Sequence, residues 1–402
     1  MRVRYVVPML AAILLLAEVS WCGDLKPAPC DPEAAGIAPV YCTNQNLTGA
    51  AKDCGTVNPK AIVGTVKSPY TVSVAIDCKD ADGKAPDVVR LDFTGQGKFD
   101  GQTMVAMKVN KEMSGPNATV MDIGPGTVSV KRGGKDYLVS VQGKYLAIAQ
   151  GNGSCVRQLT LQMAAAVEGQ CDFGAKSHKV RLIDTTGNLS FTTTAQAVTA
   201  TTPDAAPKVI GDAMFIDTGD GSFTSTVKAF YGQPAMVDGK WYVVNVSDDQ
   251  AKVNANAADV PSGTIKIDHP FWTATFVGTK YHQTVTGNAS AVTLPADTYT
   301  ITNYIERPDA KSKAGLLVAS SSKKIEVVAG KNTDVAIGSP LETSLSVNVA
   351  GGAVGFNLKC SDASGSAVSS LVNEKGVLPD APSFTVVDAS GKQVYQATLA
   401  YG

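Results

Sequence analysis

The sequence predicts an all-β protein, made of several β-sandwich domains in series that are built from hairpin repeats. Apolar and polar residues alternate with a period of two in many short runs, such as 72–78, 137–141 and 325–327. This pattern is typical of strands that bury one face. Clusters of Gly, Asn and Asp separate the runs, as tight turns require. Helical periodicity is nearly absent, and only 163–168 and 367–375 have a composition that suits a helix.

Composition limits the class of protein. The 402 residues carry 35 Lys and Arg against 36 Asp and Glu, a formal net charge of -1. This balance removes the electrostatic argument for nucleic acid or an anionic membrane surface as a partner. With 44% hydrophobic residues the chain can bury substantial cores, so most of it is not disordered. The length predicts two to four domains.

Residues 1–22 have the form of a secretory signal peptide. Two arginines precede an apolar stretch at 5–17, which is too short to span a bilayer. We expect cleavage near Cys22 and Gly23, and a secreted, periplasmic or cell-surface location. Lipid anchoring at Cys22 is the less favoured alternative, because Trp21 stands where a lipoprotein signal has a small residue. No later stretch approaches the ~20 apolar residues of a membrane-spanning helix.

The cysteines predict one disulfide. Residues 23–60 form an irregular N-terminal segment that contains Cys30, Cys42 and Cys54. Export permits disulfides, and Cys155 and Cys171 flank an apolar stretch that would form one hairpin closed by a bridge. The sequence contains no C-x2-C pair, so neither zinc nor another cofactor is expected.

A tight hairpin recurs three times. Residues 134–141, 175–182 and 239–246 align, and each copy begins directly after a turn. Gly-Gly and Asp-Gly suit the primed two-residue turns that match strand twist. One face of the following strand begins with Tyr137, His178 or Tyr242. We therefore interpret His178 as a packing residue rather than a catalytic base.

A second repeated unit is an Asp-Gly loop that follows a strand and leads to a Phe. Its copies begin at Asp92, Asp184 and Asp217. We expect residues 61–191 to form a β domain with two such units. A linker rich in Thr, Ala and Pro would follow at 192–207, and the third unit at 208–260. The preferred interpretation of each Asp is an Asx-type turn that caps the strand.

Two functional interpretations of these loops stay open as less favoured alternatives. A calcium site would use Asp92 with Asp100, or Asp217 with Asp220, but each copy lacks several of the carboxylates that calcium loops carry. An aspartic-type protease would use Asp217, because residues 214–219 resemble the apolar-apolar-Asp-Thr-Gly loop of that class. Such an enzyme needs two carboxylates that share a proton. The similar sequence at Asp184 is too near in the chain for a two-lobed enzyme.

Two segments carry family resemblances. Residues 292–301 and 325–335 are similar to the transthyretin-like (carboxypeptidase-regulatory-like) sandwich, with Asp297 in place of the usual Gly. The resemblance implies a non-catalytic β-sandwich at 261–341. The loop and hairpin at 217–246 look like a pattern found in uncharacterised exported bacterial proteins, and this resemblance implies no activity. Residues 342–402 alternate as a small Ig-like sandwich would.

Together these observations predict a non-catalytic secreted or cell-envelope protein with a structural, scaffolding or binding role. The sequence lacks the motifs of serine hydrolases, P-loop proteins and zinc proteases. The expected partner is a surface polymer or another protein. The alternative is a carbohydrate-binding or accessory module of an extracellular enzyme system. Its sugar-stacking face would draw on four aromatic residues, Trp241, Phe271, Trp272 and Tyr281.

Overall fold

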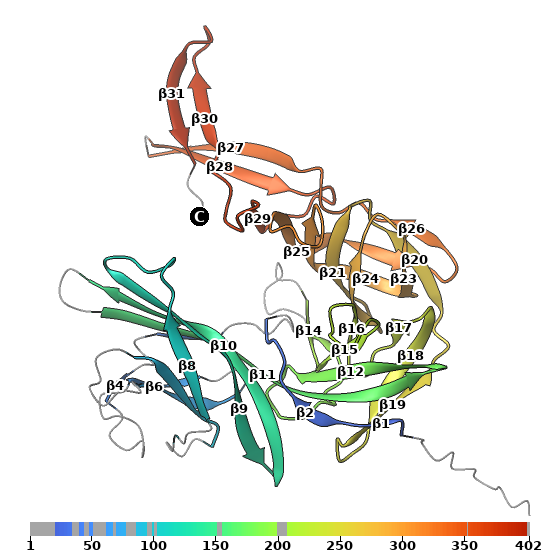
Figure 1. Cartoon of the computed structure of the whole chain (residues 1–402). Coiled ribbons are helices and arrows are strands. Elements are labelled where there is room, and N and C mark those ends of the chain that lie inside the picture. The colour runs from blue at the N-terminus through green and yellow to red at the C-terminus, as the bar shows by residue number, and fades with distance from the viewer. Residues whose placement is uncertain are drawn as a thin grey trace, which may run out of the picture.

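The computed structural model describes residues 21–33, 40–43, 48–50, 62–66, 70–77, 86–94, 99, 103–150, 155–198, 207–351 and 353–399. These residues contain many strands and no helix, so the all-β fold class is confirmed (Figure 1). Residues 1–20, most of the expected signal peptide, lie outside the described residues, as does Asp100.

Most strands form one continuous antiparallel ladder. Its order is β4 (Thr48–Ala50), β5 (Ile62–Val66), β6 (Val72–Asp77), β7 (Val88–Asp92), β8 (Met104–Val109), β9 (Ala118–Arg132), β10 (Lys135–Ala149), β11 (Cys155–Phe173), β12 (Lys176–Asp184), β15 (Ala213–Asp217), β16 (Thr226–Phe230), β22 (His282–Gly287), β21 (Phe271–Val277), β24 (Asp297–Arg307), β25 (Gly315–Val327) and β29 (Ser370–Val372). Each strand pairs with the next, and β16 meets β22 through a single residue pair, Ala229 with Gln283.

Strand β11 changes its partners on both edges along its length. Its first part pairs with β10 on one edge and with β3 (Val40–Thr43) on the other. Its last part pairs with β12 on one edge and with β2 (Lys26–Ala28) on the other. The partners change at Ala165, which faces both Val139 and Asp184. The small buried side chains at 164–166 allow the layers to approach closely there.

The predicted disulfide between Cys155 and Cys171 is wrong. Both residues lie in β11, which is one unbroken strand rather than a hairpin. Sixteen residues of strand span roughly 50 Å when straight, whereas a bridge needs Cα atoms within about 7 Å. Gly169 lies within this strand, and glycine is needed there because a Cβ would lie 2.6 Å from the carbonyl oxygen of Asp24.

The first hydrophobic core extends from Leu25 to Val253 and takes in all three loop-and-hairpin units. The segment expected as a linker does not separate them. Strand β12 pairs directly with β15, and β13 (Gln196–Val198) pairs with β14 (Lys208–Ile210) to form a small two-stranded sheet. A further sheet, in the order β1 (Gly23–Asp24), β19 (Lys252–Ala257), β18 (Lys240–Val246) and β17 (Ala235–Val237), contributes to the same core.

The second core contains Trp272, Phe276 and Tyr299, which are fully buried. It forms between β21, β24 and β25 and a three-stranded sheet of β23 (Val292–Pro295), β20 (Ser262–Lys266) and β26 (Asn332–Asp334). At Asp297, where the transthyretin-like pattern has Gly, the carboxylate accepts hydrogen bonds from the backbone N–H groups of Lys280 and Tyr281. It therefore closes the turn between β21 and β22.

The C-terminal strands form an arm that projects from the body (Figure 1). It consists of two separate two-stranded sheets, β27 (Glu342–Ala350) with β28 (Ala353–Ser361), and β30 (Ser383–Val387) with β31 (Gln393–Thr398). The described residues of this segment do not close into the small sandwich that the alternation predicted. None of their apolar side chains is fully buried.

Candidate functional site

The three predicted Asp loops occupy equivalent places at strand ends. Asp92, Asp184 and Asp217 are the last residues of β7, β12 and β15. They are 2%, 0% and 2% exposed. Each carboxylate accepts a hydrogen bond from the backbone N–H two residues further on, in Thr94, Thr186 and Gly219. The interpretation as Asx-type turns is confirmed.

The loop at Asp184 shows how fully such a carboxylate is used. One oxygen accepts from the N–H groups of Thr186 and Gly187, at 3.0 and 2.7 Å. The other accepts from the N–H of Leu189 at 2.7 Å and from the hydroxyl of Tyr70 at 3.0 Å. These donors replace the water that the buried charge has lost. Asp184 therefore holds its loop and is not free to act on a substrate.

Two further copies of the loop were not recognised in the sequence. Asp362 and Asp388 each begin the string Asp-Ala-Ser-Gly, and each accepts from the N–H and the hydroxyl of the Ser two residues on. The shared pattern D-x-[S/T]-G also describes 92–95 and 184–187. This four-residue string is thus the sequence signal that could have revealed the two further copies. It marks a hydrogen-bonded turn at the end of a strand.

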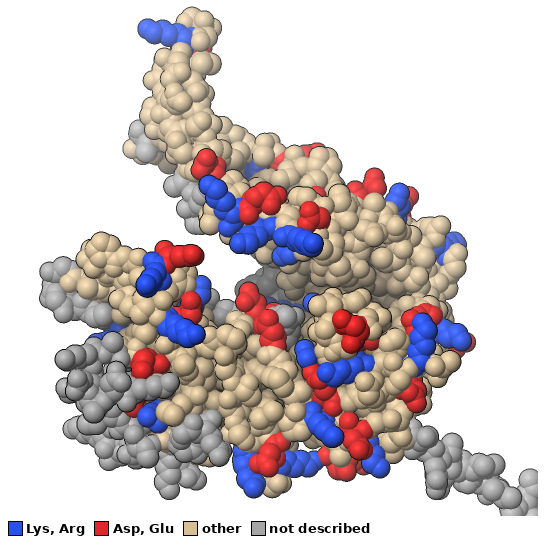
Figure 2. All heavy atoms as spheres, in the orientation of Figure 1, with Lys and Arg blue, Asp and Glu red and all other residues tan. Residues whose placement is uncertain are grey.

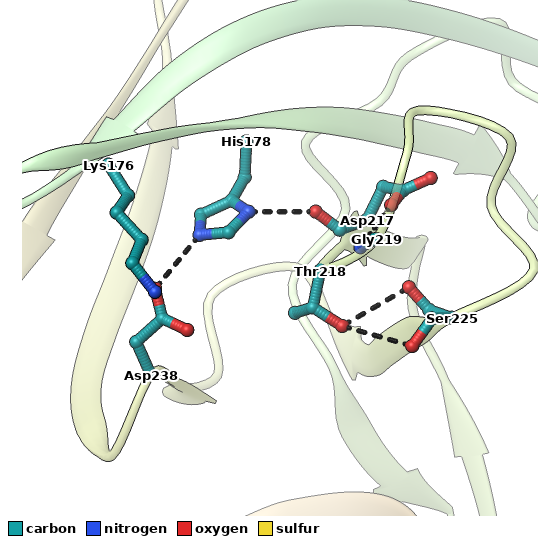
Figure 3. Close-up of polar contacts among 7 residues, drawn as sticks. All are labelled: Lys176, His178, Asp217, Thr218, Gly219, Ser225 and Asp238. Carbon is teal, nitrogen blue, oxygen red and sulfur yellow. Dashed lines mark hydrogen bonds and ion pairs between the residues drawn. The ribbon is translucent and has the colours of Figure 1, made fainter.

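The geometry does not support a protease dyad. Strands β12 and β15 are antiparallel, and Asp184 and Asp217 are their last residues, so the two carboxylates lie at opposite ends of the β12–β15 ladder. The two carboxylates are therefore separated by roughly 16 Å of strand and cannot share a proton. One oxygen of Asp217 also accepts the backbone N–H of Gly219 (Figure 3), and the other accepts that of Phe223.

His178 links two loops instead of activating a nucleophile. Its Nδ1 lies 2.9 Å from the carbonyl oxygen of Asp217, and its Nε2 lies 3.1 Å from the carboxylate of Asp238 (Figure 3). Lys176 pairs with the same carboxylate at 3.2 Å. The hydrogen bonds from His178 and Lys176 hold the pKa of Asp238 below its ordinary value. The ring is buried and packs edge-on against Phe173, so the predicted packing role is confirmed.

Of the residues proposed for calcium, the described Asp92, Asp217 and Asp220 each accept hydrogen bonds from their own loop. The carboxylate of Asp92 accepts from the N–H and the hydroxyl of Thr94. Asp220 is exposed and accepts from the N–H of Ser222. Within the part of the chain that the structure describes, no group of three or more His, Cys, Asp or Glu side chains is placed to hold a metal ion.

The proposed sugar-stacking aromatic residues do not share a face. Trp272 is fully buried in the second core, and the buried Trp241 donates its indole N–H to Ser262 at 2.6 Å. Phe271 begins β21, whereas Tyr281 lies beyond the other end of that strand. The four aromatic residues named for a sugar-stacking face therefore do not form one.

Comparisons with protein-family models, with curated proteins and with solved structures found no match for this chain. Among the described residues, no helix is long and apolar enough to cross a membrane.

The most distinctive surface is the apolar arm face, one side of the β27–β28 hairpin. It consists of Leu345, Val347, Val349, Val354, Phe356 and Leu358, which form three directly opposed pairs. Val347 and Val349 are 56% and 70% exposed. Figure 2 shows few charged side chains on the arm between its tip and the place where it joins the body. Large exposed apolar patches on monomers commonly mark interaction sites.

The second hairpin contacts this face through aromatic rings. The rings of Phe356 and Phe384 lie 4.3 Å apart between centroids, and Phe384 also contacts Tyr395. Val387, Val394 and Tyr395 of this hairpin are themselves more than half exposed. The arm thus presents apolar side chains from both hairpins.

Proposed function

We propose that the protein is a non-catalytic scaffold of the secreted or cell-envelope space, and that its molecules associate through the apolar arm face. The observation that carries this proposal is the set of three opposed apolar pairs on β27 and β28, in which every member except the half-buried Phe356 is exposed. The N-terminal sequence supports the location, because residues 1–22 have the form of an export signal.

A second copy of the chain is the partner that fits this face. Two identical apolar hairpins can pack face to face at the ~10 Å spacing of a β-sandwich. Strands β30 and β31 carry no Lys, Arg, Asp or Glu, and the face itself carries none, so two copies meet without charge repulsion. The association would supply the second layer that the alternation at 342–361 requires.

The hydrogen-bonding edges of β27 and β28 also favour a second copy of the chain as the partner. Within the described residues, no strand pairs with the outer edge of β27. The outer edge of β28 is bridged only at its end, where Ser361 pairs with Ala367 and the N–H of Val368 donates to Cys360. Natural proteins usually protect such edges with Lys, Pro or bulges. The interior of β27 has none of these devices, since its sequence is ETSLSVNVA.

The test is the association state of the full chain in analytical ultracentrifugation across a range of concentrations. We expect the wild type to form dimers and Val347→Lys to stay monomeric, because a buried unpaired charge opposes the contact. The matched control is Ser346→Lys, on the opposite face of the same strand, which should dimerise like the wild type. A monomeric wild type, or equal effects of the two substitutions, would overturn the proposal.

A further inference from the structure

The first described strand brings two cysteines together. Cys22 precedes β1, Cys171 lies near the end of β11, and their sulfur atoms are 2.9 Å apart although 149 positions separate them in the chain. Cys171 is fully buried. Cys22 is partly buried and packs against the first core. The contact therefore joins the sheet that contains β1 and β19 to strand β11.

Glycines on both segments make this approach possible. A Cβ on Gly23 would lie 1.9 Å from the carbonyl oxygen of Gln170, and a Cβ on Gly169 would lie 2.6 Å from that of Asp24. Both distances are far below ordinary contact, so the two backbones can cross here only where side chains are absent. The neighbouring cysteines are held on either side of this crossing.

The backbone fixes Cys22 in this position. Its N–H donates to the carbonyl oxygen of Val253 at 3.0 Å, and Gly23 pairs with the same residue in the β1–β19 ladder. The N–H of Asp172 lies 3.4 Å from the Cys22 sulfur. Cys22 is thus an ordered part of the folded domain.

We propose that Cys22 and Cys171 form a structural disulfide in the exported protein. The two thiols each lose a proton and together lose two electrons, and an S–S bond forms. The electrons reduce the disulfide of a thiol–disulfide oxidant, such as a protein disulfide oxidase or oxidised glutathione, to two thiols. The sulfurs need to approach by only about 0.9 Å to reach the ~2.05 Å bond length.

The surroundings favour a structural bond over a reactive thiol. Burial raises the pKa of the Cys171 thiol, and its contact with Cys22 raises it further. A thiol that does not ionise is a poor nucleophile. Oxidation therefore belongs to folding, before the core closes over Cys171.

The bridge would place two limits on the N-terminus. Signal cleavage must occur before Cys22, rather than between Cys22 and Gly23, because cleavage there would remove one partner. The Cys22 sulfur also cannot carry a lipid, since a sulfur in an S–S bond has no free valence for a thioether. One structural contact thus selects between the processing alternatives that the sequence left open.

Peptide mapping of the full chain, exported with its own N-terminal segment and alkylated without reduction, tests the bond. We expect a peptide pair joining Cys22 to Cys171, which separates on reduction with a gain of two hydrogen atoms. Alkylated Cys171 in the unreduced protein, Cys171 joined to Cys155 or another cysteine, an N-terminus at Gly23, or a lipid on Cys22 would each overturn the proposal.

Stability measurements give a second readout. Cys22→Ala and Cys171→Ala should each lower the Tm by roughly 10 °C, and the double variant should be no less stable than the weaker single one. Reduction of the wild type should give the same shift. Cys360→Ser, on β28 in the arm, should leave the Tm unchanged. Additive single effects, or a reduced protein as stable as the oxidised one, would contradict a shared bond.

Discussion

Single aspartates determine much of the local structure of this protein. In each D-x-[S/T]-G loop the carboxylate accepts the N–H two residues on, and the Ser or Thr hydroxyl donates to the same oxygen. Such side-chain contacts compete with the strand ladder and end it. The same four residues therefore stop a strand and begin a turn wherever they occur.

The two Asp-Ala-Ser-Gly loops form a matched pair for measuring what burial adds. Asp362 is 1% exposed and also accepts the N–H of Gly338, whereas Asp388 is exposed. Asp362→Ala leaves several buried donors unpaired and should lower the free energy of unfolding by roughly 2–4 kcal/mol. Asp388→Ala should cost less than ~1 kcal/mol. Urea unfolding followed by tryptophan fluorescence measures both, and equal losses would disprove the role of burial.

The burial of Asp212 leads us to expect that the stability of the fold depends on pH. It is fully buried, and desolvation raises its pKa from 3.8 to about 7, with the nearby charge of Asp184 adding to the rise. Between pH 4 and 7 the folded protein therefore holds a proton that the unfolded chain has lost. Stability should fall as the pH rises through this window, by at most about 4 kcal/mol.

Asp212→Asn removes this titration while keeping an acceptor for the N–H of Thr193. We expect the urea midpoint of the variant to change less between pH 4 and 7 than that of the wild type. Asp220→Asn, at an exposed loop position, is the control and should keep the wild-type slope. If the slope survives in Asp212→Asn, the decrease has another source.

At the scale of elements, the turns could be predicted from the sequence and the long strand could not. Two of the three two-residue turns lie where Gly133-Gly134 and Asp238-Gly239 placed them. The third lies one residue beyond the predicted Phe-Gly, at Gly174-Ala175, because Phe173 pairs with Lys176. Gly134, Gly174 and Gly239 all have positive φ. These turns depend on local chemistry. The continuity of β11 depends on a backbone crossing over Gly169, a contact between residues far apart in the chain.

The difference between local and long-range contacts also explains which features of the candidate sites could be predicted from the sequence. Asp92, Asp184 and Asp217 could be interpreted correctly because their donors lie within a few residues. The partner of Cys171 could not be found by spacing, because it lies 149 positions away. The exposure of the arm was equally unpredictable, since alternation indicates a buried face without showing what buries it.

Tyr70 should stabilise β11 at the point where its partners change. The buried hydroxyl accepts the N–H of Ala165 at 2.9 Å and donates to Asp184. Tyr70→Phe leaves the Ala165 N–H unpaired, so we expect a loss of about 1–3 kcal/mol in the free energy of unfolding. Tyr137→Phe, on a half-buried ring that packs on Phe191, should cost clearly less. A comparable loss in the two variants would contradict this role.

For the whole molecule, two separate cores imply two cooperative units. The first core ends at Val253, and the second begins at Ile265. Their junction includes the single residue pair between β16 and β22. It also includes two hydrogen bonds, from the backbone N–H of His282 to Gln233 and from the Gln283 side chain to Pro234. Such a junction couples the units without merging their interiors.

Gln283 provides the test of this coupling. Its side chain is 4% exposed and donates to the carbonyl oxygen of Pro234 at 2.9 Å. Gln283→Met keeps the size but leaves that carbonyl unpaired, so the two calorimetric transitions should move further apart, with the second core melting at the lower temperature. Thr284→Ser, on the opposite face of β22, keeps the hydroxyl that bonds Thr275 and should leave the separation unchanged. A single transition in both variants would mean that the two cores unfold as one unit, and that contacts beyond Gln283 hold them together.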